Sequence, residues 1–171
     1  MELRGTLSVL GAVSMEVTCR KMTKAHRKDA ELLLDLFLRK DVNYLQTSDI
    51  YGDEGLSALR RALALFLRRK DLGFVWLAYA SGCPVGACVV SYAISTSVGG
   101  LVAKLDDVYV SALRRREGIA TQMLTALIRE MRERGLRRID TSVYKRNRSA
   151  TYLYKKLGFR ELQEERLALV L

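Results

Sequence analysis

The segment Lys104–Met123, KLDDVYVSALRRREGIATQM, constrains the fold more than any other part of the chain. It begins with a strand-like run at 105–110, passes through a basic turn and shows helical periodicity from Ile119 onward. A helix N-terminus carries partial positive charge, so the three arginines before it are unfavourable unless an anion lies between them. Gly118 would let backbone amides approach such an anion closely. The pattern indicates either a phosphate or pyrophosphate site, or a solvated basic loop.

A second segment, Asn147–Phe159 (NRSATYLYKKLGF), reads as an N-capped helix that ends at a glycine. The two segments together resemble the GCN5-related N-acetyltransferase (GNAT) family. Residues 115–120, RREGIA, fit its acetyl-CoA signature Arg/Gln-x-x-Gly-x-Gly/Ala, and 147–159 resemble its later Asn-x-x-Ala…Leu-Tyr-x-Lys-x-Gly-Phe segment. The resemblance covers about residues 15–171 and is sharp only over 105–159.

The order of predicted elements, β-α-α-β-β-β-α-β-α-β, indicates a single domain of the α/β class over residues 1–171. We expect strands at 16–22, 74–80, 85–95, 105–110, 137–144 and 166–171, and helices at 24–39, 56–70, 118–134 and from 147 onward. The resemblance implies a three-layer α/β sandwich around a mixed sheet whose central parallel strands, 105–111 and 137–144, splay apart for the cofactor. Residues 1–14 form an N-terminal extension, and either Met1 or Met15 can be the start.

Positive charge is concentrated in one part of the chain. The net charge is +10, and residues 101–160 hold 15 Lys or Arg against 6 Asp or Glu. A basic field of this kind suits an anionic partner such as coenzyme A or a nucleic acid. We find no helix-turn-helix spacing, zinc-finger spacing or RNP aromatic motif, so nucleic acid is the less favoured partner.

Several classes of protein are disfavoured by the sequence. The single histidine, His26, and three cysteines without metal-type spacing predict no metal site and no histidine-dependent triad. No apolar run approaches the roughly 18 residues of a membrane span. The apolar run at 7–13 lacks the positive flank of a signal peptide, so we expect a reduced, cytoplasmic setting.

The resemblance implies roles for individual residues. It places pyrophosphate on the backbone amides of 116–121 and pantetheine along the backbone of 108–110. The cofactor-binding residues implied in this way are Val108, Tyr109, Val110, Arg115, Arg116, Glu117, Gly118, Ile119, Ala120, Thr121 and Asn147. Tyr154 matches the family's tyrosine acid, because a phenol with a pKa of about 10 can protonate a thiolate with a pKa of about 8.5. Its place on the apolar face also fits a core residue, and Tyr152 is the second choice.

Asp106 and Asp107 are the candidate bases. Adjacent residues of a strand face opposite sides, so only one of them can point toward the acceptor. Polyamine acetyltransferases have a motif that resembles Glu-Asp-hydrophobic-aromatic-Val and indicates Asp106. Aminoglycoside 3-N-acetyltransferases have one that resembles Asp-Leu-Ala-Val-Ser and indicates Asp107. The sequence DDVYVS fits both, and it also fits a purely structural pair.

The sequence therefore predicts an acetyl-CoA-dependent N-acetyltransferase that transfers acetyl directly to the primary amine of a small molecule. The tyrosines and carboxylates of 41–55 either shape the acceptor pocket or form an ordinary polar loop. The alternatives are a protein N-terminal or lysine acetyltransferase, and a non-catalytic protein that binds acyl-CoA or nucleic acid. We expect no membrane contact, and the resemblance admits a homodimer.

Overall fold

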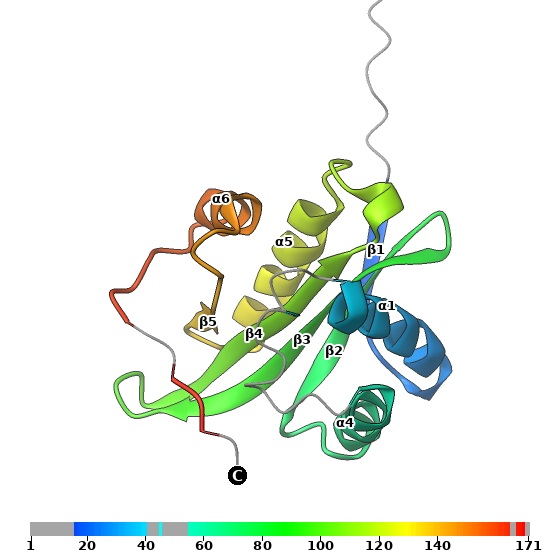
Figure 1. Cartoon of the computed structure of the whole chain (residues 1–171). Helices are drawn as coiled ribbons and strands as arrows, with labels where there is room; N and C mark the ends of the chain where they lie inside the picture. The colour runs from blue at the N-terminus through cyan, green and yellow to red at the C-terminus, as the bar shows by residue number, and fades with distance from the viewer. Residues whose placement is uncertain (1–15, 41–44, 46–54, 165–166, 170–171) are drawn as a thin grey trace, which may run out of the picture.

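The computed structural model describes residues 16–40, 45, 55–164 and 167–169 (Figure 1). Its centre is a five-stranded sheet in the order β1-β2-β3-β4-β5. The strands are β1 (Val17–Lys21), β2 (Gly73–Ala80), β3 (Cys83–Ser95), β4 (Gly100–Val110) and β5 (Ile139–Thr141). The first four pair with one another in antiparallel fashion, and β5 runs parallel to β4. The mixed sheet of the predicted α/β class is confirmed.

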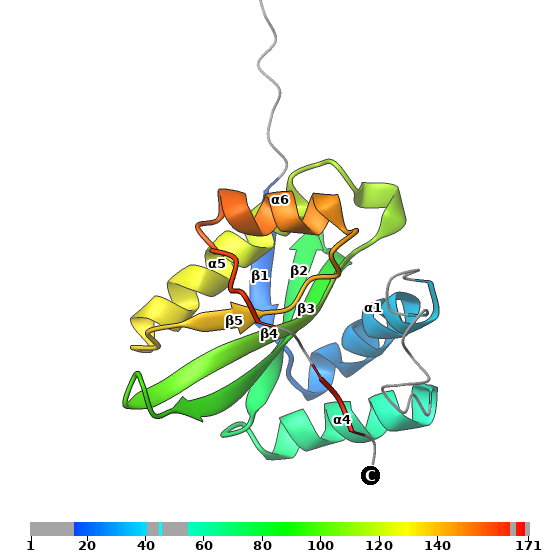
Figure 2. The same cartoon turned by 60° about the vertical axis from the view of Figure 1, so that its left-hand side comes forward.

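Helices cover both faces of the sheet (Figures 1 and 2). On one face lie α1 (Arg27–Lys40), which follows a short 3-10 turn, and α4 (Leu56–Arg68). On the other lie α5 (Ile119–Glu133) and α6 (Arg148–Lys156). Each face has its own apolar cluster, so the predicted three-layer sandwich is confirmed.

The sequence explains the two layers. Every residue of β2 is buried because helices cover both of its faces, which suits its near-continuous apolar sequence, GFVWLAYA. The inward side of α5 repeats at helical spacing, and its fully buried members are Ile119, Met123, Leu124, Leu127 and Met131.

A β-bulge interrupts β4. Val89 pairs with Asp106 and Ala87 pairs with Tyr109, so Cys88 alone lies opposite two residues of β4. One of these is Asp107, whose φ of 52° is in the left-handed region that aspartate tolerates better than most residues. The bulge changes which side chains face which layer: Leu105 packs on the α5 side, and Tyr109 packs with α1 and α4.

The two parallel strands diverge beyond a short contact. β4 and β5 pair only through Ala103–Leu105 and Ile139–Thr141, after which β4 continues to Val110. The predicted strand 137–144 is therefore too long, because β4 and the residues that follow Thr141 no longer pair. This divergence is the splay that the sequence predicted.

The predicted strand at 166–171 is wrong for residues 167–169, which belong to no strand, while 166 and 170–171 lie outside the described residues. The side chains of Leu167 and Leu169 are 89% and 84% exposed, so their alternation does not reflect packing on a sheet. The extension 1–14 is also outside the described residues. Among the described helices, none is long and apolar enough to cross a membrane.

Candidate active site

The turn before α5 brings backbone amides and positive charge together. Gly118 is the N-cap of α5 in a left-handed conformation with a φ of 77°, and Arg116 has a φ of 67°. The first hydrogen bond of the helix runs from the Gln122 amide to the Gly118 carbonyl at 3.0 Å. The amides of 119–121 precede it and therefore have no partner of this type within the helix.

The side chains of this turn divide into exposed and engaged groups. Arg115 and Arg116 are exposed, and the Arg115 side chain donates to the Val110 carbonyl at 3.4 Å. Glu117 forms an ion pair with Arg114 at 2.9 Å, which neutralises the one acidic side chain of the turn. Ile119 is buried in the core, so only its backbone could contact a ligand. Ala120 and Thr121 are half-buried in the first turn of α5.

The last residues of β4 lie beside the divergence of the two strands. Val108 and Val110 are half-buried against the apolar cluster on the α5 side. Tyr109 is buried on the opposite side, where its ring lies 6.5 Å from that of Phe37. The backbone of 108–110 extends past the last residue that pairs with β5. This stretch is where the resemblance places the pantetheine arm.

Tyr154 projects from α6 into the core near the end of β5. Its side chain is 8% exposed, and its ring lies 5.3 Å from that of Phe159. Burial raises the pKa of the phenol to about 12, and the polar Thr141 side chain acts in the opposite direction. The negative charge of Asp106 adds to the rise, so this carboxylate lies close enough to affect the phenol. Tyr152, the second choice, is 71% exposed on the same helix.

The two aspartates occupy different environments. Asp106 forms an ion pair with Lys104 at 2.8 Å. Because Leu105 packs on the α5 side, Lys104 and Asp106 lie on the face that carries α1 and α4. Asp107 lies in the bulge and adds to the rise in pKa of the Cys88 thiol, which is caused first by burial. The bulge interrupts the regular alternation of side chains at this point of β4, and which aspartate points toward an acceptor stays a prediction.

Asn147 caps α6 as predicted. The Ala150 amide and the Ser149 hydroxyl both donate to its Oδ1, at 3.1 Å each. The oxygen of the carboxamide is thus engaged by the helix, and the NH2 group is the end suited to a cofactor contact. Residues 41–44 and 46–54, which the sequence suggested for the acceptor pocket, lie outside the described residues.

A comparison with protein families places this geometry in a known group. The model of the acetyltransferase (GNAT) family matches residues 39–159, most of the chain. The chain belongs to the GNAT family.

Individual relatives agree with this assignment. The GNAT chain is 32% identical over 90 residues to a thialysine N-epsilon-acetyltransferase of Sus scrofa, a match that covers 50% of this chain and 52% of that protein. It thus spans about half the length of the curated relative. A crystal structure of a probable acetyltransferase has a TM-score of 0.69 at 27% identity and covers 90% of this chain and 96% of its own. A predicted acetyltransferase of Clostridium acetobutylicum, solved with acetyl-CoA, has a TM-score of 0.64 at 25% identity, with coverages of 90% and 96%.

Sequence reasoning missed two side chains at the candidate site. Lys104 neutralises Asp106, and its position two residues earlier on the strand was the available signal. Thr141 donates a hydrogen bond to the Leu105 carbonyl of β4, but a threonine in a strand is ordinary, so no signal in the sequence pointed to it. The remaining site residues lie around the divergence of β4 and β5 and the start of α5.

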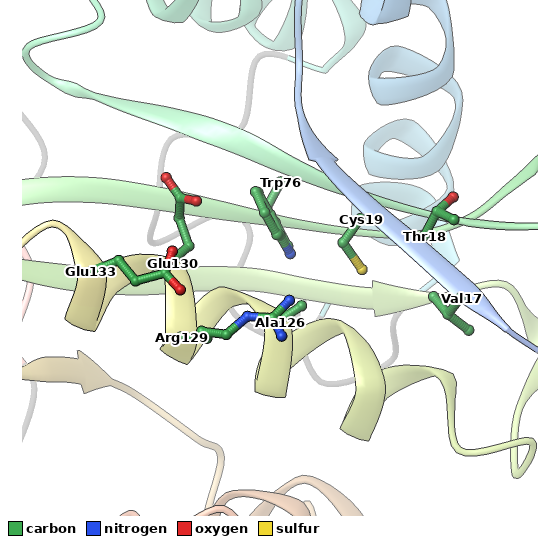
Figure 3. A pocket seen from close by; sticks show the side chains of 8 residues that line it. All are labelled: Val17, Thr18, Cys19, Trp76, Ala126, Arg129, Glu130 and Glu133. Atoms are coloured by element: carbon green, nitrogen blue, oxygen red, sulfur yellow. The ribbon is translucent and has the colours of Figure 1, made fainter.

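A separate pocket of about 380 Å³ lies between β1 and α5 (Figure 3). Cys19, Trp76 and Arg129 are among its lining residues. The Trp76 indole donates to the Met123 carbonyl at 3.2 Å, and burial raises the pKa of the Cys19 thiol to about 11. The thiol is therefore protonated at neutral pH and is a weak nucleophile. None of the site residues named above lines this pocket.

Proposed function

We propose that this GNAT chain is an N-acetyltransferase that transfers acetyl from acetyl-CoA to the primary amine of a small molecule. The observation that carries the proposal is that Tyr154 is buried in the same apolar cluster as Ile119, the first residue of α5, which follows a turn with exposed arginines. The thialysine acetyltransferase among its relatives supports a small acceptor.

The basic turn and the start of α5 suit the pyrophosphate of the coenzyme. The amides of 119–121 point out of the first turn of the helix, and the helix dipole favours negative charge there. Arg115 and Arg116 would add attraction, because both are exposed and Glu117 is already paired with Arg114. The backbone of 108–110 would hold the pantetheine amides, and the Asn147 NH2 group would add a further contact.

The surroundings of each side chain suggest the role that it would have in the transfer reaction. Acetyl-CoA supplies an activated thioester carbonyl. Asp106 would attract the acceptor amine and accept its proton, because it lies on the face away from α5. Tyr154 would give its proton to the sulfur that leaves, since a phenol with a raised pKa stays protonated at neutral pH. The amide of Tyr109 or Val110 is the candidate donor to the carbonyl oxygen. Asp107 would hold the bulge that exposes this backbone.

The first test is calorimetric titration of the purified protein with acetyl-CoA. We expect saturable binding by the wild type and none by Arg116→Glu or Gly118→Asp, because each adds negative charge where pyrophosphate would lie. Arg68→Glu is the matched control, since it makes the same charge change on the exposed surface of α4. A folded wild-type protein that does not bind acetyl-CoA would contradict the proposal.

The acceptor class is tested by release of free thiol from acetyl-CoA. The panel contains spermidine, kanamycin, lysine and a peptide with a free N-terminal alanine. We expect turnover with at least one small amine and little with the peptide. The reverse result would favour a protein acetyltransferase, and binding without turnover of any amine would favour a non-catalytic acyl-CoA binder.

A further inference from the structure

We propose that Lys104 determines which amine is acetylated, and that this amine is an amino acid or a similar molecule that carries a carboxylate. The ammonium group of such an acceptor would pair with Asp106, and its carboxylate would pair with Lys104. This inference rests on the proposed acetyltransferase function and names the class of small amine. It concerns a side chain to which the sequence pattern assigned no role.

The sheet holds Lys104 and Asp106 on one face of β4. Their partners on β3 are Ser91 and Val89, and Val89 packs with the apolar cluster of α1 and α4. Because paired residues of neighbouring strands share a face, Lys104 and Asp106 both project to the side of the sheet away from α5. The backbone of 108–110, proposed to hold the pantetheine arm, begins two residues after Asp106. The ion pair therefore lies next to the proposed place of the cofactor.

Both members of this ion pair are accessible to a ligand. The Lys104 Nζ and the Asp106 Oδ2 lie 2.8 Å apart, and the two side chains are 45% and 26% exposed. An ion pair that water reaches contributes little to stability, because solvent screens the attraction and two side chains lose freedom. A molecule that offers both charges could separate Lys104 from Asp106 at small cost and satisfy each of them.

A second ion pair continues this row of charges on β5. Asp140 is the register partner of Lys104, and Arg138 pairs with Asp140 at 2.8 Å. Ile139, which lies between them, packs on the α5 side, so Arg138 and Asp140 face the same way as Lys104. Positive and negative side chains alternate across the row, and their charges cancel.

This balance of charge distinguishes classes of amine. A polyamine or an aminoglycoside carries several positive charges and is favoured by an excess of carboxylates. In this row each carboxylate already has a cation, and Lys104 would repel a second positive charge close to Asp106. A zwitterion brings one charge of each sign, and each charge meets its opposite. The flexible stem of Lys104 would let its ammonium follow the carboxylate of acceptors of different length.

The test compares acceptors with and without the carboxylate, with release of free thiol from acetyl-CoA as the readout. Lysine, β-alanine and γ-aminobutyrate are each assayed beside the corresponding carboxamide, and putrescine is added as a diamine. We expect the wild type to use at least one acid with a kcat/KM about 10-fold or more above that of its amide, because the amide loses a hydrogen bond between charged groups.

Variants of Lys104 assign this preference to one side chain. Lys104→Met should abolish it and raise the KM for the acid, with the Kd for acetyl-CoA unchanged. It should also raise kcat/KM for putrescine about 3-fold, because Asp106 loses its competing cation. Such a gain cannot come from misfolding. Lys104→Arg keeps a cation and should retain most of the preference. Lys28→Met is the matched control, since it removes the same charge from the exposed surface of α1 and should change neither ratio.

Three results would overturn the inference. They are equal use of each acid and its amide by the wild type, an unaltered preference in Lys104→Met, and turnover of putrescine or kanamycin without turnover of any acid. The last would indicate a purely cationic acceptor. A wild type that acetylates no small amine of either panel would instead refute the proposed function itself, so the two failures are distinguishable.

Discussion

Tyr154 combines two properties that are usually found apart. It packs against Phe159 as a core residue, and the negative charge of Asp106 on β4 also acts on its phenol. Burial favours the neutral phenol, so the side chain remains protonated until the pH approaches about 12. The raised pKa makes Tyr154 available as an acid throughout the neutral range. It also means that any loss of activity below pH 10 must come from another group.

We expect Tyr154→Phe to lower kcat by about 100-fold or more, because general acid catalysis commonly contributes at least this factor. The ring is kept, so the thermal unfolding midpoint and the affinity for acetyl-CoA should change little. Steady-state kinetics between pH 6 and about 10 should show no alkaline limb that belongs to Tyr154. Tyr152→Phe is the matched control, since this exposed tyrosine is on the same helix and should retain full activity. Equal activity of Tyr154→Phe and wild type would assign Tyr154 to the core alone.

At the scale of elements, the start of α5 depends on one residue. Gly118 has a φ of 77°, and a Cβ added there would meet no atom within 4 Å. A larger side chain is therefore opposed by backbone strain and not by crowding in the protein itself. The same open space is what a pyrophosphate would occupy under the proposed function.

Gly118→Ala should cost about 1 kcal/mol of unfolding free energy, because a left-handed conformation is unfavourable for alanine. It should also weaken acetyl-CoA binding, since the added methyl group would lie where the phosphates approach. Gly82→Ala is a close control: Gly82, in the turn between β2 and β3, also has a φ of 77°, and a Cβ added there would likewise meet no atom within 4 Å. Chemical denaturation should give similar losses of unfolding free energy for both variants. Calorimetric titration with acetyl-CoA should show weaker binding for Gly118→Ala alone. Equal acetyl-CoA affinities would argue against a ligand at Gly118.

Local sequence patterns predict some elements of this fold and leave others open. Helix α5 and strand β2 follow from periodicity and continuous apolar sequence, which are local properties. The length of β5 does not follow from local sequence, because it depends on where β4 and β5 stop pairing. The bulge at Asp107 is also invisible locally, since two adjacent aspartates in a strand look regular. For the same reason the sequence pointed to Tyr154 and the basic turn but not to the hydrogen bond from Thr141 to Leu105.

At the scale of the whole molecule, charge is distributed unevenly. The segment 101–160 contributes an excess of nine positive charges, from 15 basic and 6 acidic residues, to a total of +10. It contains α5, α6 and the proposed cofactor site. A field of this kind would raise the rate at which an anionic coenzyme arrives, and salt would weaken it.

We expect the Kd for acetyl-CoA to rise about 3- to 10-fold between 50 and 500 mM salt, because the Debye length shortens below the size of the site. A milder change than glutamate, Arg116→Gln, should flatten this dependence, since one charge of the site is removed. Arg68→Gln removes the same charge from α4 and should leave the slope near that of wild type. Isothermal titration at several salt concentrations measures all three slopes. Identical slopes would show that net charge, and not local charge, governs binding.

The bulge in β4 also bears on the two layers of the molecule. Leu105 before it and Val108 after it both pack on the α5 side, although an uninterrupted strand would place them on opposite faces. The bulge therefore absorbs one extra residue without changing the layer that either side chain meets. Deletion of Asp107 alone would leave a regular strand in which Leu105 and Val108 keep the α5 side and Tyr109 keeps the opposite side, so the extra residue shapes the local backbone and not the packing of the two layers.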